Sequence, residues 1–116
     1  MAALFYGTFM GQKLYLIKND KYRLDIIAFD KEFDKIKSGR IKYNYRFSIK
    51  EKLSEGALES YPANVMDSGL GFSLKSQLNF GMYLYVIDKI DVRGESVKEL
   101  AYGFIEILPD VAAIPL

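Results

Sequence analysis

The sequence contains no cysteine, no histidine and no tryptophan, and only three prolines. Without cysteine the chain has no disulfide, no thiolate nucleophile and no thiolate metal ligand. Without histidine it lacks the commonest metal ligand and the base of the usual catalytic triads. No apolar run reaches the roughly 18 residues that a membrane helix needs. We therefore expect a non-enzymatic chain with no cofactor, no metal and no membrane partner.

The size and charge of the chain limit the number of domains and the kinds of partner that it can have. With 116 residues there is room for one domain, residues 1–116, and the 50% of hydrophobic residues suit a globular protein. The formal net charge is only +1, so any electrostatic partner must be inferred from local clusters of charge. No basic segment precedes the apolar N-terminal run, so we expect no signal peptide and a cytoplasmic location.

The chain is rich in aromatic residues, with nine tyrosines and eight phenylalanines. Both residue types favour strands. Short alternating or apolar segments separated by turn residues predict an all-β domain. The strand candidates are Lys13–Lys18, Tyr22–Phe29, Arg40–Lys50, Ala63–Met66, Leu70–Leu74, Phe80–Asp88 and Ala101–Leu108. Their even spacing indicates a small closed or partly closed barrel, or a sandwich.

Turn residues separate several of these strands. Asn19-Asp20 and Arg93-Gly94-Glu95 have turn chemistry, and the first predicts that Lys13–Lys18 and Tyr22–Phe29 form a hairpin. Asp30–Lys37 carries helical spacing over about eight residues, so at most one short helix is expected there.

The segment Arg40–Lys50 has basic and aromatic faces. Arg40, Lys42 and Arg46 alternate with Tyr43, Tyr45 and Phe47, and Lys37 precedes them. Alternate residues of a strand lie about 7 Å apart on one face, a spacing that suits successive phosphates. The aromatic rings could stack on bases. The alternative is an ordinary half-buried strand, with its aromatic side chains in the core and its charges in water.

Two further constellations are weaker. Asp25, Asp30, Glu32 and Asp34, and separately Asp88 and Asp91, could supply oxygen ligands to Mg²⁺ or Ca²⁺, but solvated surface charge is the interpretation we favour. Tyr6–Gln12 and the later Tyr61-Pro62-Ala63 resemble segments of γ-glutamylcyclotransferase-like enzymes. That resemblance requires a glutamate as general acid–base, and Glu95 is the nearest candidate.

A longer series of landmarks extends from Leu24 to Pro109. In order, they are Leu24-Asp25-Ile26, Phe33, Ser38-Gly39, Phe47 to Leu53, Tyr61-Pro62, Val65, Gly81-Met82-Tyr83, Val92, Gly94 and Leu108-Pro109. In this order and spacing the chain resembles the gene V-type single-stranded DNA-binding proteins of filamentous phages. Met66 and Glu106 depart from the family pattern, which has basic residues there.

The resemblance implies a small OB-like barrel of about five to seven strands with a protruding hairpin. Residues 1–22 would be an N-terminal addition to this barrel. It also implies a viral protein of DNA replication that acts as a homodimer in the host cytoplasm. The family positions fall on Lys37, Lys42, Phe47 and Tyr61, and the hairpin would include Arg40–Lys50.

The sequence thus gives three hypotheses. The leading one is non-catalytic, largely sequence-independent binding of single-stranded DNA, or of RNA in its place. Its expected contacts are Lys37, Arg40, Lys42, Tyr43, Tyr45, Arg46, Phe47 and Tyr61. The second is a protein-interaction or virion structural module that adds a strand to the same segment. The third is the γ-glutamylcyclotransferase-like enzyme.

Overall fold

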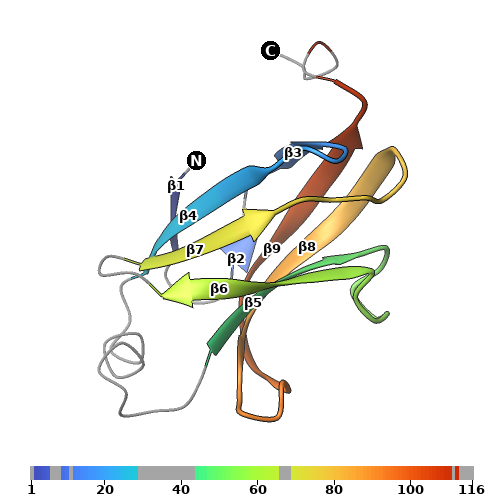
Figure 1. Ribbon diagram of the computed structural model, residues 1–116. Coiled ribbons are helices and arrows are strands. Elements are labelled where there is room, and N and C mark those ends of the chain that lie inside the picture. Colours follow the sequence, from blue (N-terminus) through green and yellow to red (C-terminus); the bar gives the residue numbers. More distant parts are fainter. Residues whose placement is uncertain are drawn as a thin grey trace.

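The structure is a computed structural model that describes residues 2–5, 9–10, 12–28, 44–65, 69–110 and 112 (Figure 1). Its strands are β1 (Ala2–Phe5), β2 (Phe9–Met10), β3 (Leu14–Ile17), β4 (Tyr22–Ala28), β5 (Asn44–Lys50), β6 (Glu59–Val65), β7 (Gly69–Leu74), β8 (Gly81–Ile90) and β9 (Ser96–Leu108). Each of the seven predicted strands has an observed counterpart among β3 to β9. The described part contains no helix that is long and apolar enough to cross a membrane.

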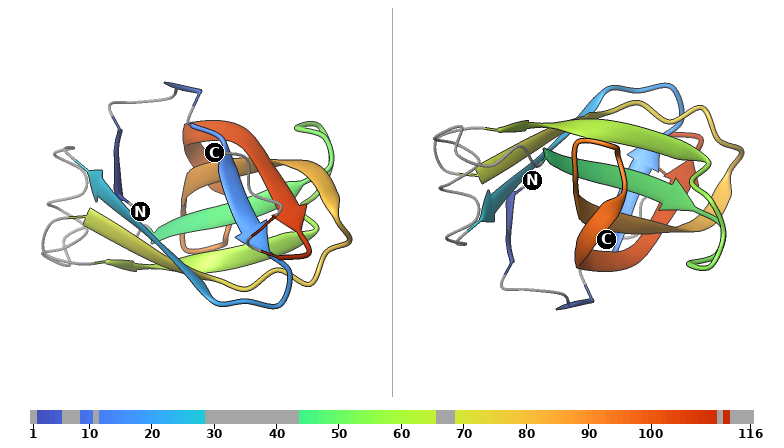
Figure 2. Two further views of the ribbon diagram at one scale, coloured as in Figure 1. Left: turned by 90° about the horizontal axis from the view of Figure 1, so that it is seen from above. Right: turned by 90° about the horizontal axis from the view of Figure 1, so that it is seen from below.

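The strands form one strongly curved sheet, seen from either end in Figure 2. Its order is β1-β4-β7-β6-β5-β8-β9-β2, with β3 also paired to β9. The seven strands β3 to β9 run almost completely round a barrel, whose remaining gap lies between β3 and β4. The prediction of a small all-β barrel is confirmed.

The strands can also be viewed as two layers, which are joined where β5 pairs with β6. Strands β4, β7 and β6 form one layer, and β5, β8, β9 and β3 form the other. If β3 to β9 are lettered A to G, this is the B-E-D and C-F-G arrangement of immunoglobulin-type sandwiches, with strand A paired to G. Tyr83, near the start of β8, donates its hydroxyl to the backbone oxygen of Asn79 at 2.9 Å. Such a tyrosine corner is a further mark of that architecture.

Alternation of side chains along the strands builds the core between the layers. Tyr45, Phe47 and Ile49 point inward from β5, with exposed fractions of 2%, 0% and 0%. The other large, fully buried side chains include Phe72 of β7 and Ile105 of β9. The Phe47 ring stacks on that of Tyr85 with centroids 5.3 Å apart and planes 5° apart, and it also contacts Phe72 at 5.7 Å.

The predicted hairpin of Lys13–Lys18 and Tyr22–Phe29 is wrong. Strand β3 pairs in parallel with β9, whereas β4 pairs with β7 and β1. The turn itself is present, with Asn19 at a φ of 68°. It carries the chain from one layer to the other, which explains why turn residues alone did not predict the pairing. The helix considered at Asp30–Lys37 lies outside the described residues.

A hairpin does extend beyond the barrel, but β8 and β9 form it (Figure 1). Strand β5 instead lies inside the sheet. It pairs with β6 over Arg46–Ile49 and with β8 over Asn44–Lys50. The idea that this segment is one limb of a protruding hairpin is therefore corrected for the residues that are described.

Candidate functional site

The aromatic side of the expected interface belongs to the core. Tyr45 and Phe47 are 2% and 0% exposed, and Phe47 is packed between other rings. A ring that stacks on a base must offer a face to the ligand. We therefore correct the sequence interpretation and assign these two residues to packing. Lys37, Arg40, Lys42 and Tyr43 lie outside the described residues.

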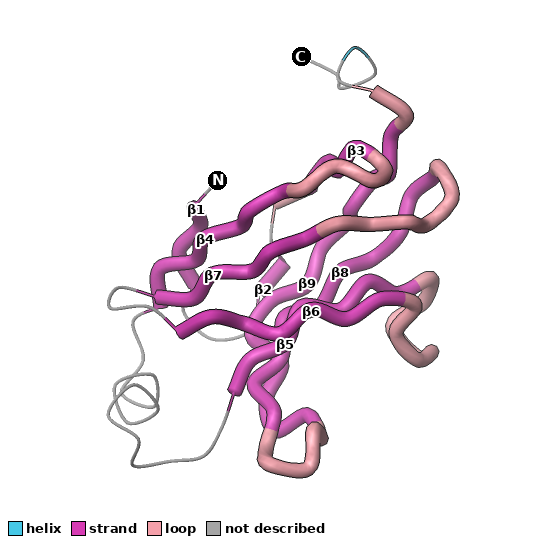
Figure 3. Tube along the Cα trace, in the orientation of Figure 1, coloured by secondary structure: helices cyan, strands magenta, loops and turns pink. Residues whose placement is uncertain are grey.

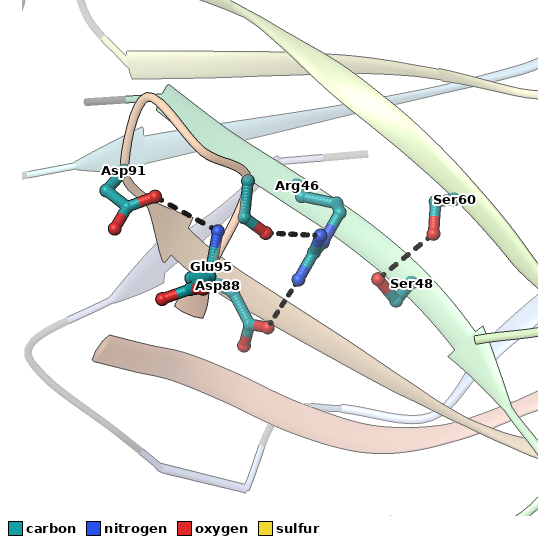
Figure 4. Close-up of polar contacts among 7 residues, drawn as sticks. Arg46, Ser48, Ser60, Asp88, Asp91 and Glu95 are labelled. Atoms are coloured by element: carbon teal, nitrogen blue, oxygen red, sulfur yellow. Dashed lines mark hydrogen bonds and ion pairs between the residues drawn. The ribbon is translucent and has the colours of Figure 1, made fainter. Parts of the chain in front are cut away.

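Arg46 points out of the barrel but is held by the β8–β9 hairpin (Figure 4). One guanidinium nitrogen donates to the backbone oxygen of Gly94 at 3.0 Å, and another pairs with Asp88 Oδ2 at 3.4 Å. Its Nε is buried and has no hydrogen-bond partner in the described part of the chain. Releasing Arg46 to a phosphate would leave Asp88, which is 6% exposed, without this cation. Arg46 thus anchors the hairpin.

The turn that presents Gly94 is organised by Asp91. Its Oδ1 accepts hydrogen bonds from the backbone nitrogens of Arg93 at 2.8 Å and Glu95 at 3.1 Å, the second of which is drawn in Figure 4. These bonds, above all the one from Glu95, lower the pKa of the Asp91 carboxyl. The predicted turn at Arg93-Gly94-Glu95 is confirmed, with Gly94 at a φ of 81°. Asp88 and Asp91 have structural partners here.

Tyr61, like Arg46, is a predicted contact that remains partly accessible. Its hydroxyl lies 2.9 Å from both Glu59 Oε1 and the backbone oxygen of Lys75, and its single proton can be donated to one at a time. Burial, reinforced by the Glu59 carboxylate, raises the pKa of the Tyr61 hydroxyl well above its ordinary value. The ring meets Phe47 edge-on at 6.4 Å. Tyr61 therefore ties β6 to the end of β7.

A basic groove of about 470 Å³ lies over the start of β4 and the end of β7. Its lining residues are Lys21, Tyr22, Arg23, Ser73, Leu74 and Lys75. This lining has three cations and no acidic residue, in a chain whose net charge is only +1. We call this feature the basic groove.

The register of β4 and β7 brings these cations together. Tyr22 pairs with Leu74 and Arg23 with Ser73, so Lys21 and Lys75 follow at the same end of the ladder. Neither lysine forms an ion pair with a described acidic side chain. Like charges facing each other across strands are destabilising, and an anion placed between them would relieve that repulsion.

Arg23 is positioned by its neighbours on the outer face of the same strands. Its Nε donates to Asp25 Oδ1 at 2.8 Å. A Cβ on Gly71 would lie 2.7 Å from a guanidinium nitrogen of Arg23, so the absence of a side chain at Gly71 lets the guanidinium lie across β7. The Arg23 guanidinium is therefore held over Gly71 and Asp25, on the side of Arg23 away from Lys21 and Lys75.

Two connections meet beside the groove. The β3–β4 turn and the β7–β8 connection lie at the same end of the barrel, on the right in Figure 3. The backbone nitrogen of Asn19 donates to the oxygen of Ser76 at 2.8 Å, and that of Lys18 donates to Leu108 at 2.9 Å. Lys18 Nζ lies 5.5 Å from the ring centroid of Phe80. Another cation and an exposed aromatic ring thus lie at the same end of the barrel as the groove.

An apolar patch occupies the outer face of β8 and β9. Met82 and Phe104 are 50% and 49% exposed. Leu84 pairs with Phe104 and Met82 with Glu106, which makes Met82 and Phe104 diagonal neighbours on that face. We call Met82, Leu84 and Phe104 the outer apolar patch.

The site that the third hypothesis, a γ-glutamylcyclotransferase-like enzyme, requires is not assembled in the described part. Phe9–Met10 of β2 pairs with Ala101–Tyr102, and Glu95 lies beyond the start of β9. At about 3.3 Å per residue, this separation along the strand is roughly 20 Å. Glu95 is exposed and does not line the basic groove. The described residues also contain no group of three or more His, Cys, Asp or Glu side chains placed to hold a metal.

Sequence reasoning missed the basic groove because its cations come from separate segments. Lys21 and Arg23 flank Tyr22 at the start of one strand, and Lys75 follows another strand much later in the chain. Alternation along β4 is enough to put Arg23 and Asp25 on one face of the strand. Only the pairing of β4 with β7 brings Lys75 to them.

No protein-family model and no curated protein sequence matches the chain. Among solved structures, the chain is similar to the cysteine protease inhibitor EhICP2 from Entamoeba histolytica, at 14% identity and a TM-score of 0.43. The match covers 92% of this chain and 97% of that one.

Proposed function

We propose that this chain binds single-stranded nucleic acid without catalysis, and that the phosphates lie in the basic groove. The observation that carries the proposal is the grouping of Lys21, Arg23 and Lys75 round one groove, with two of these cations unpaired by described acidic residues. The partner remains the one inferred from the sequence, but the groove replaces Arg40–Lys50 as the contact surface among the described residues.

The groove suits a flexible polyanion better than an isolated small anion. The cations follow one another along two paired strands, with Lys21 and Lys75 at the end of the ladder and Arg23 two residues from Lys21. A strand places alternate side chains about 7 Å apart, which suits a single strand that can adjust its phosphate spacing. Tyr22 is partly buried and Leu74 belongs to the core, so the accessible lining of the groove is mainly its cations and Ser73.

The test is binding of an oligothymidylate of about twelve nucleotides, a length within the site sizes of single-strand binders. Fluorescence anisotropy of the labelled oligonucleotide should show binding at low salt. About four phosphate contacts predict that log K falls against log salt with a slope of roughly −3. Lys21→Gln combined with Lys75→Gln should weaken binding about tenfold and reduce that slope by about one to two.

Lys98→Gln is the matched control. Lys98 is an exposed lysine near the start of β9, at the end of the barrel opposite to the groove. It should leave both the affinity and the salt slope unchanged. No binding at low salt would refute the proposal, and so would equal losses in the groove variant and the control.

The outer apolar patch favours a second candidate function, a protein-interaction module. In the hypothesis from the sequence, a partner adds a strand to the Arg40–Lys50 segment. This addition is not available between Arg46 and Ile49, because both edges of β5 are already paired there. The exposed side chains of Met82 and Phe104 would serve instead. A viral origin, a role in DNA replication, a homodimer and a cytoplasmic location stay predictions of the family resemblance.

A further inference from the structure

Phe80 presents an exposed aromatic ring at the end of the barrel where the β7–β8 connection lies. It is 59% exposed, the largest fraction for any aromatic residue among the described exposed hydrophobics. It comes immediately before β8, at the end of the connection that starts beside Lys75. Its ring surface is therefore available to a ligand.

The backbone on either side of Phe80 is held in place. Ser76 is fully buried, its backbone oxygen accepts from Asn19, and its Oγ accepts from the backbone nitrogen of Leu78 at 3.2 Å. On the other side, Tyr83 donates its hydroxyl to Asn79 at 2.9 Å. The ring is therefore offered from a braced connection, which lowers the entropy cost of binding a ligand there.

A positively charged side chain, that of Lys18, lies close to the Phe80 ring. Lys18 Nζ lies 5.5 Å from its centroid, on the turn that is bonded to Ser76. Five residues of chain span at most about 17 Å, so Phe80 lies within that distance of Lys75 and the basic groove. A short single strand could therefore occupy the groove and reach the ring with a neighbouring nucleotide.

We propose that Phe80 is a base-stacking residue, with Lys18 contacting the phosphate of the stacked nucleotide. This inference rests on the proposed function and deepens it, because it makes the ligand a polyanion recognised by its bases as well as its phosphates. The basic groove supplies affinity for the backbone. Phe80 supplies the preference for a strand that carries bases, and this preference is largely independent of sequence because every base has a π-face.

The experiment compares oligothymidylate with an abasic oligonucleotide of the same length and charge. The full chain should bind oligothymidylate more tightly, by roughly tenfold for one stacked base. Phe80→Ala should remove this difference and leave the affinity for the abasic strand unchanged. Phe80→Leu should behave like Phe80→Ala, because it keeps apolar bulk without the ring.

Phe80→Trp should restore the preference for bases. Since the chain has no other tryptophan, this variant also reports stacking directly through quenching of its fluorescence by oligothymidylate and not by the abasic strand. Val92→Ala is the control, because Val92 is 74% exposed at the tip of the β8–β9 hairpin. It should preserve the difference between the two ligands.

The outcomes separate the two proposals. Equal affinity of the wild-type chain for both strands overturns the stacking inference and leaves phosphate binding in place. A preference for oligothymidylate that survives Phe80→Ala also overturns it, because the bases would then contact another surface. Failure of both strands to bind at low salt refutes the proposed function, and the stacking inference with it.

Discussion

At the scale of single residues, aromatic packing decides what the β5 side chains can do. Phe47 is stacked on Tyr85, and the Tyr85 hydroxyl donates to the backbone oxygen of Gln12 at 2.7 Å. Burial raises the pKa of that hydroxyl to about 12. The same rings that suggested stacking on bases stack instead on each other. Alternation predicted which residues share a face, but it could not tell whether that face meets bases or the core.

Gly103 should tolerate no side chain. A Cβ there would lie 2.8 Å from the Tyr85 ring, which is fixed between Phe47 and the bond to Gln12. We expect Gly103→Ala to lower the free energy of unfolding by about 1–3 kcal/mol, the usual cost of overpacking. Urea unfolding followed by tyrosine fluorescence would measure it. Gly56→Ala, where a Cβ meets nothing within 4 Å, is the control and should change stability little. An equal effect in both variants would contradict the packing argument.

At the scale of elements, the β8–β9 hairpin and β5 depend on each other through Arg46. The Asp91 turn holds Gly94 where its oxygen can accept from Arg46. The turn at Arg93-Gly94-Glu95 was predicted from its residues, but the pairing of β8 with β9 was not. The contact to Arg46 could not be predicted, because it depends on the register in which Arg46 pairs with Asp88.

Asp91 should make the hairpin sensitive to acid. Its folded pKa is lowered, so its stabilising contribution is present above the unfolded value near 4 and is lost as pH falls through the folded pKa. We expect the loss of unfolding free energy between about pH 5 and pH 2 to be smaller in Asp91→Asn than in the wild type. Urea titrations across that range would test this, with Asp110→Asn as the control. The same acid dependence in Asp91→Asn and the wild type would count against the role assigned to the turn.

At the scale of the whole molecule, seven strand segments and the all-β class were predictable because alternation and turn residues are local signals. The order of those strands was not. Strands β3 and β4 enter different layers. Nothing in the residues Asn19-Asp20 distinguishes a turn that crosses between layers from a hairpin turn. The basic groove depends on that order, which is why its cations were not grouped from the sequence.

The oligomeric state is also decided at this scale. We expect a homodimer from the family resemblance, and the outer apolar patch is the surface available for it in the described part. If a second copy covers the patch, Met82→Ser combined with Phe104→Ser should reduce the mass at equilibrium to that of a monomer. Sedimentation equilibrium measures this, with Val97→Ser, at 49% exposure, as the control. A wild-type monomer at every concentration would show that the patch has another purpose.

The parallel pairing of β3 with β9 has a mechanical consequence. Leu14 to Ile17 run in the same direction as Ile105 to Leu108, so the start of one segment and the end of the other lie at opposite ends of the pair. A force that pulls the chain apart through these two ends slides the strands past each other. Their hydrogen bonds are then loaded together and not opened one after another. The barrel should therefore resist stretching along this axis until the whole pair gives way at once.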